Sequence, residues 1–81
     1  MYEVHKSMRV LPPAELVKIG ELLYGAHWKT EMARHLGVNR LTIIRWVQGA
    51  HPVPEEAVEA VYRLAWEKYK ELEKLFSAEM L

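Results

Sequence analysis

Six side chains between residues 39 and 48 are of the types that recognise base edges in the major groove of double-stranded DNA. Arginine forms two parallel hydrogen bonds with guanine, side-chain amides pair with adenine, and branched aliphatic groups contact the methyl group of thymine. Arg40 is the first candidate for a guanine contact, with Arg45 as the second. The candidate base contacts are Asn39, Arg40, Leu41, Ile44, Arg45 and Gln48.

Each of these side chains also has a simpler structural interpretation. Asn39 is the only asparagine and Gln48 the only glutamine of the chain, and an asparagine at this place suits the cap of a helix. The two arginines could be solvated surface. Leu41 and Ile44 could be buried against a partner subunit instead of against thymine.

Four further side chains are candidates for contact with the phosphate backbone of DNA. Such contacts position a protein on the duplex but do not read its sequence, and they make binding sensitive to salt. For Arg34 an ordinary surface role is equally consistent, because it lies near the far end of its predicted helix. The candidates are Lys29, Thr30, Arg34 and Thr42.

The residues that would position these side chains have the spacing of two helices joined by a tight turn. Ala33 is small enough to let a second helix cross closely. Gly37 follows four residues later, where a sharp turn requires one residue at positive φ. Ile43 and Trp46 are three residues apart and therefore share the inner face of the second helix.

Capping signals give the bounds of these two helices. We predict the first helix from about 28 to 36 and the second from about 40 to 48. Asn39 would cap the second helix and Gly49 would end it. The segment from 29 to 48 is therefore the predicted DNA-binding motif.

This motif resembles the helix-turn-helix of small phage and bacterial transcriptional regulators, the class that includes the lambda-type repressor and Cro proteins. The similarity extends from Leu23 to Pro54, where a Tyr-Gly element precedes the motif and a Gly-x-x-Pro-x-Pro turn follows it. The resemblance implies a dimeric repressor that binds an inverted repeat through the major groove. It also implies repression of its own promoter or of a neighbouring phage or anti-CRISPR operon.

The rest of the chain predicts a single all-α domain over 1–81, with about four helices. A helix from about 13 to 24 begins after two prolines and has a predicted inner face of Leu16, Ile19, Leu22 and Leu23. A long C-terminal helix is expected over about 55–78. Residues 1–11 could be a short strand, an arm or a disordered segment.

The long C-terminal helix carries apolar residues at alternating spacings of three and four. This heptad-like pattern is longer than a three-helix core of this size could cover, which favours a homodimer formed through it. We call these residues the C-terminal seam, and they are the predicted dimer interface: Tyr62, Ala65, Tyr69, Leu72 and Phe76.

Composition argues against other classes of function. The net charge is zero, but residues 1–50 carry seven Lys or Arg against four Glu, whereas residues 51–81 carry four against seven. Residues 1–50 are therefore the basic half of the chain, and they contain the predicted DNA-binding motif. The chain has no cysteine and no aspartate, and its histidines lack metal-ligand spacing, so no enzyme, metal or cofactor is predicted. The three tryptophans are predicted to lie in the core. The sequence shows no membrane segment, and we expect the protein in the cytoplasm.

Two rival functions remain at the level of sequence. The first keeps the fold but makes the protein an excisionase-like or antitoxin-like DNA binder, which bends DNA or neutralises a toxin through its acidic C-terminal helix. The second is a helical protein-interaction module without a DNA function, which predicts no salt-sensitive affinity for DNA.

Overall fold

The structure is a computed structural model, which describes residues 10–80, with side chains to residue 77. Within these residues the chain forms four α-helices and one short 3-10 helix. The elements are α1 (Pro13–Tyr24), η2 (Gly25–His27), α2 (Trp28–Leu36), α3 (Arg40–Gln48) and α4 (Glu55–Met80). The all-α prediction is confirmed. The predicted bounds of the first three helices are also confirmed, and α4 continues two residues beyond the expected end. Most of the predicted N-terminal arm lies outside the described residues.

Local signals explain where the helices begin and end. Pro13 occupies the first turn of α1, where its fixed φ and missing N–H carry no penalty. Gly37, with φ 71°, ends α2, and its N–H donates to the carbonyls of Ala33 and Arg34. Gly49, with φ 77°, ends α3 in the same way. Both glycines adopt the left-handed conformation that the sequence predicts for them.

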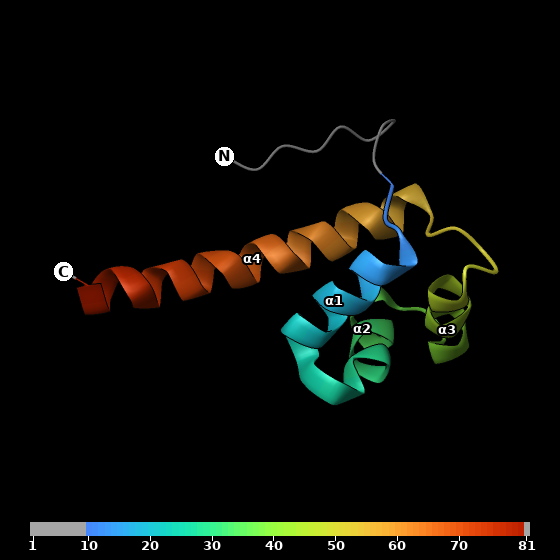
Figure 1. Ribbon diagram of the computed structural model, residues 1–81, viewed down its shortest axis with the longest axis horizontal. Helices are drawn as coiled ribbons and strands as arrows, with labels where there is room; N and C mark the ends of the chain where they lie inside the picture. The colour runs from blue at the N-terminus through green and yellow to red at the C-terminus, as the bar shows by residue number, and fades with distance from the viewer. Residues whose placement is uncertain (1–9, 81) are drawn as a thin grey trace.

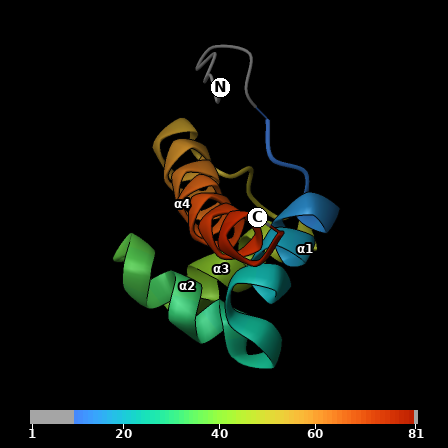
Figure 2. The same ribbon diagram turned by 90° about the vertical axis from the view of Figure 1, so that its left-hand side faces the viewer.

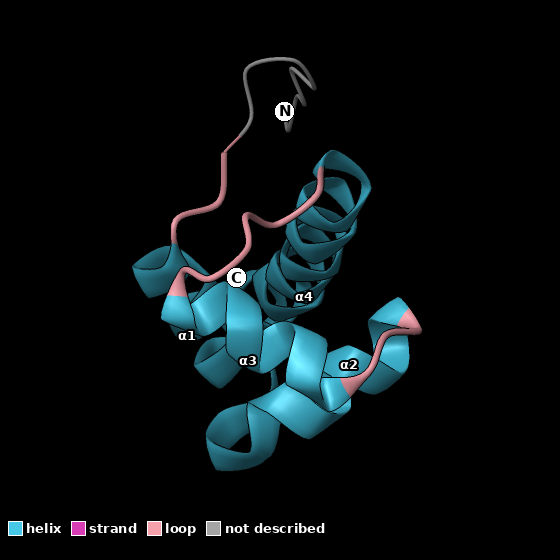
Figure 3. Cartoon of the chain, turned by 90° about the vertical axis from the view of Figure 1, so that its right-hand side faces the viewer, coloured by secondary structure: helices cyan, strands magenta, loops and turns pink. Residues whose placement is uncertain are grey.

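In Figure 1, α1 and α2 lie below α4, and α3 lies to their right, below the loop that leads into α4. Helix α2 packs on α1 and α3, and both α1 and α2 also pack on α4. Seen from its right-hand side in Figure 3, α3 lies across the end of the domain, in front of the other helices. The C-terminal half of α4 projects beyond the rest of the domain (Figures 1 and 2). None of the described helices combines the length and the apolarity needed to cross a membrane.

One hydrophobic core joins all four α-helices and the segment before α1. Trp28, Met32 and Ile43 are its largest members near the centre, and Leu16 and Val61 connect it to α1 and α4. Ala33 is buried between helices, as its small size predicts. The buried apolar residues are Leu11, Leu16, Trp28, Met32, Ala33, Ile43, Trp46, Val58 and Val61.

Two residues predicted to lie in the core do not lie there. Leu22 was expected on the inner face of α1, but it is 75% exposed. At about 100° per residue, it is rotated by roughly 120° from Leu16 around the helix, which places it outside the inner face. Trp66 is half-buried on α4 and stacks against Tyr69, with ring centroids 5.4 Å apart. It lies where α4 begins to leave the core.

The close contact between Gly20 and Trp28 was not predicted. Gly20 is buried in α1, and a Cβ atom built on it would lie 2.1 Å from Cε3 of Trp28. The indole ring therefore occupies the space of the missing side chain. Glycine here serves packing, because its φ is not in the left-handed region.

We expect Gly20→Ala to lower the free energy of unfolding by about 1 to 3 kcal/mol, although alanine favours a helix more than glycine does. The reason is that the new methyl group must displace a buried indole ring. Thermal unfolding followed by circular dichroism measures this effect. Lys18→Ala, on the exposed face of the same helix, is the matched control. An unchanged melting temperature for Gly20→Ala would contradict the close packing of Trp28 on Gly20.

Candidate nucleic-acid interface

Helix α3 has two clearly separated faces. Ile43 and Trp46 are buried in the core, with exposed fractions of 0% and 4%, and they fix the rotation of the helix about its axis. The predicted base-contact residues of α3 follow one another around the opposite side, over an arc of about 140° at about 100° per residue. Four of them are exposed and Ile44 is half-buried. We call this set the α3 outer face: Arg40, Leu41, Ile44, Arg45 and Gln48.

The two arginines of the α3 outer face are available for an external partner. Neither Arg40 nor Arg45 forms an ion pair with any described residue of the chain. Leu41 lies between them around the helix and is 48% exposed. The surface therefore combines two guanidinium groups, an amide and two branched aliphatic side chains. These are the groups that hydrogen-bond guanine and adenine and contact thymine.

Asn39 serves as the cap of α3. Its side-chain Oδ1 accepts a hydrogen bond of 2.8 Å from the backbone N–H of Leu41, and its own backbone is extended, with ψ 144°. The structural interpretation of Asn39 is thus confirmed. Its oxygen is the same atom that a two-bond pairing with adenine would use, so a base would have to share this oxygen with the cap.

The predicted phosphate contacts lie on both motif helices. Thr30 is exposed on α2, whereas Thr42 is half-buried on α3. Lys29 is half-buried, and its Nζ lies 5.2 Å from the ring centroid of Trp28. Arg34 forms an exposed ion pair of 3.3 Å with Glu31. An exposed pair of this kind contributes at most about 1 kcal/mol, so a phosphate could replace the carboxylate.

A hydrogen bond that sequence reasoning missed joins α1 to α2. The hydroxyl of Tyr24, at the end of α1, and Nδ1 of His35 form a hydrogen bond of 2.6 Å, in which the hydroxyl donates when His35 carries its proton on Nε2. Burial, and secondarily the carboxylate of Glu31, raise the pKa of Tyr24 above its ordinary value of 10.0. The hydroxyl therefore keeps its proton at neutral pH. No helical periodicity connects residues eleven apart across a turn, so the sequence carried no signal for this pair.

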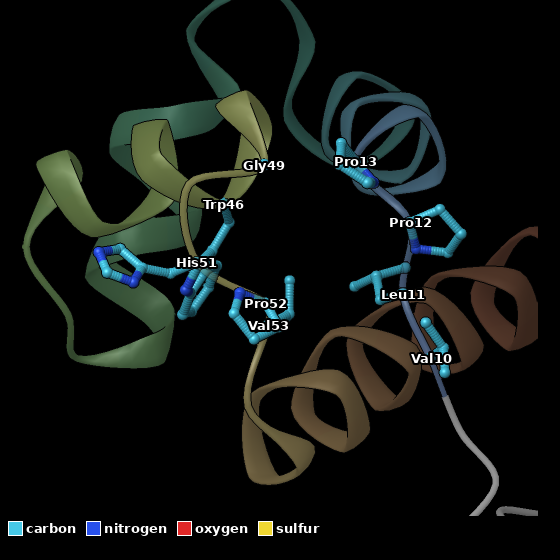
Figure 4. A pocket seen from close by; sticks show the side chains of 9 residues that line it. All are labelled: Val10, Leu11, Pro12, Pro13, Trp46, Gly49, His51, Pro52 and Val53. Atoms are coloured by element: carbon cyan, nitrogen blue, oxygen red, sulfur yellow. The ribbon is translucent and has the colours of Figure 1, made fainter.

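A separate cavity of about 360 Å³ lies between the segment before α1 and the loop that joins α3 to α4 (Figure 4). Leu11, Pro12 and Trp46 contribute to its lining, and the ring of His51 points away from Leu11 and Pro12. The cavity brings together none of the predicted DNA contacts. Among the described residues, no group of His and Glu side chains is arranged to hold a metal ion.

Comparison of the chain with protein-family models, with curated proteins and with solved structures found no match. The structure brings the five predicted base contacts of α3 onto one surface and assigns the sixth, Asn39, to capping. The phosphate candidates on α2 and α3 belong to two helices that pack directly against each other.

We expect Asn39→Ala to lower the free energy of unfolding by about 1 kcal/mol, because the N–H of Leu41 loses its acceptor. Asn39→Asp keeps a capping oxygen and should retain most of the stability. Urea denaturation of the three proteins measures the difference. Equal losses in both variants would show that the side chain stabilises α3 by some means other than the cap.

We expect Tyr24→Phe to change how stability depends on pH. Folding raises the pKa of Tyr24, so the stabilisation by its neutral hydroxyl is fully present below pH 10 and is lost as the pH rises through the raised value. The variant lacks the hydrogen bond, which lowers stability by about 0.5 to 1.5 kcal/mol at neutral pH. It should then lose less stability than the wild type above pH 10. Urea denaturation of the wild type and the variant across this range tests this; parallel curves would contradict it.

Proposed function

We propose that this protein is a sequence-specific, double-stranded DNA-binding transcriptional regulator in which α2 and α3 form a helix-turn-helix. In this arrangement α3 enters the major groove and α2 lies against the backbone. The three-residue connection between the helices contains Gly37 in the left-handed conformation, and Asn39 caps the second helix. Both features support this assignment.

The observation that carries the proposal is the α3 outer face. A surface helix of a small domain normally exposes polar residues of mixed charge, with no concentration of base-reading types. Here the exposed side of α3 has two arginines that form no ion pair with the residues the structure describes, one amide and no acidic residue. Leu41, large, apolar and exposed between the arginines, is unfavourable in water but suits a thymine methyl group.

The distribution of charge supports the same orientation on DNA. The first turn of α4 carries Glu55 and Glu56, both exposed, and α4 packs on α1 and α2 without approaching α3 through its backbone. Glu56 lines the same pocket as Trp46, which is buried on the inner side of α3, so the acidic start of α4 faces α3 from the side opposite the α3 outer face. This separation reduces the repulsion between Glu side chains and phosphates that a neutral protein would otherwise experience.

We further propose that the regulator acts as a homodimer and a repressor on an inverted repeat. The distal part of the C-terminal seam supports a dimer, because Tyr69, Leu72 and Phe76 are exposed in the single chain. Two-fold symmetry then places the half-sites about 10 base pairs apart, one turn of the duplex. A dimer bound across a promoter would block the polymerase. Regulation of its own promoter or of a phage or anti-CRISPR operon belongs to the same proposal.

Selection of duplexes from random or genomic fragments, followed by fluorescence anisotropy on the selected sequence, tests DNA binding. We expect Arg40→Ala to weaken binding by about 1 to 3 kcal/mol, roughly 5- to 150-fold in Kd, and to relax the preference at one base pair. Arg63→Ala removes the same charge from the exposed surface of α4 and is the matched control. Lys29→Ala should weaken all sequences alike and reduce the dependence on salt.

Absence of binding to every duplex would overturn the proposal. So would binding that is indifferent to sequence and equally affected by Arg40→Ala and Arg63→Ala. The exposed apolar residues of α4 favour the protein-interaction module as the second candidate in that event.

A further inference from the structure

One apolar patch of the molecule is not covered by any described residue. Five large side chains on α1 and α4 are between 43% and 75% exposed, and together they expose on the order of 500 Å². This is large for a domain of 81 residues. It also approaches the roughly 800 Å² that each partner contributes to a stable protein interface. We call it the α1–α4 patch: Leu22, Tyr69, Leu72, Leu75 and Phe76.

The α1–α4 patch contains both a groove and a ridge. The groove has a volume of about 220 Å³ and lies where α1 ends beside α4. Ile19, Leu22 and Leu23 line one wall, and Ala65 and Tyr69 belong to the other. The ridge is the projecting part of α4 that carries Leu75 and Phe76 (Figure 1). A surface with a groove and a ridge of the same chemistry is self-complementary under two-fold symmetry.

We propose that the occupant of the groove is the projecting end of α4 from a second copy of this chain, in antiparallel orientation. Phe76 of each copy then enters the groove of the other and lies over Ala65, and Tyr69 lies opposite Leu72. This arrangement rests on the homodimer of the proposed function and specifies how its subunits join. It also gives Leu22 a role, because the α4 end of the second copy covers it.

Side-chain size favours the antiparallel orientation. Antiparallel pairing matches the bulky Phe76 with the small Ala65, which fills the space between the helices evenly. Parallel pairing would place Phe76 against Phe76, Tyr69 against Tyr69 and Ala65 against Ala65. Parallel pairing would thus alternate overpacked layers of two aromatic rings with underpacked layers of two alanines. The N-terminal part of the seam also packs within its own protomer, because the hydroxyl of Tyr62 donates to Glu15 on α1.

Charge permits this pairing. In the antiparallel register Lys68 lies near Leu75 of the second copy, where its aliphatic stem can pack and its ammonium group can reach water. Glu73 lies near Trp66 of the second copy. Like charges therefore do not face each other across the flanks of the seam, and the pairing avoids the repulsion that would oppose it.

The length of α4 suits a duplex. The two-fold axis of this arrangement passes between residues 70 and 71, and α4 is anchored to its own core at Val58 and Val61. About 11 residues separate the axis from each anchor, so the two anchors lie about 33 Å apart along the helices at about 1.5 Å per residue. One turn of B-DNA is about 34 Å. The proposed dimer thus places the α4 anchor points of its two domains about one turn of the duplex apart.

Disulfide trapping between two single-cysteine variants tests the arrangement without DNA. The wild-type chain has no cysteine, so Ala65→Cys and Phe76→Cys each introduce one. Facing positions bring the Cα atoms within the 4.4 to 6.8 Å that a disulfide requires. We expect a cross-linked dimer after mild oxidation of the mixture and none from either variant alone. Each mixed dimer retains one intact layer of Phe76 over Ala65, so pairing survives the substitution.

Sedimentation of the wild-type chain and of Leu22→Glu provides a second test. Leu22 is exposed in the single chain, so the substitution should leave the circular dichroism spectrum unchanged while it weakens the dimer by at least about tenfold. Val10→Glu, at another exposed apolar residue, is the matched control and should leave the dimer intact.

Three outcomes would overturn the arrangement. They are a wild-type monomer at micromolar concentration, a disulfide formed by Phe76→Cys alone, and a Leu22→Glu dimer as stable as the control. Each leaves the DNA-binding proposal standing if anisotropy still shows selective binding that depends on Arg40. If the protein cross-links as expected but binds no DNA, the proposed function fails and the proposed dimer stands.

Discussion

The packing of Trp28 on Gly20 is the contact on which the arrangement of the other helices depends. The indole ring fills the place that a side chain at residue 20 would occupy, so α1 and α2 approach each other closely. This close approach brings Leu16 and Met32 into the same core. Helix α3 then packs on the surface that α1 and α2 form together, which fixes the direction of the α3 outer face.

The elements that depend on local physics could be predicted from the sequence. The bounds of α1, α2 and α3, the left-handed conformation of Gly37 and Gly49, and the cap at Asn39 are confirmed. Each of them results from interactions within about four residues. The division of α3 into an inner and an outer face follows from helical periodicity for the same reason.

The features that the sequence could not predict are contacts between distant segments. Gly20 looks like a weak point in a helix until the ring of Trp28 is placed over it. The hydrogen bond between Tyr24 and His35 depends on the angle at which η2 joins two helices. Leu22 was assigned to the core because it is apolar, but its rotation around α1 places it on the surface. Apolar character alone does not distinguish a core position from an exposed position.

The backbones of the described helices α3 and α4 make no close contact, although Trp46 and Ala57 line the same pocket, and both helices pack on α1 and α2. The pair α1 and α2 thus acts as an adaptor between a helix that faces outward and a helix that projects from the domain. Substitutions on the projecting half of α4 would leave the shape of the α3 outer face unchanged, and substitutions on that face would leave the projecting half of α4 unchanged. Under the proposed function, assembly of the dimer and recognition of DNA would therefore vary independently. Such a modular arrangement allows the two properties to evolve separately.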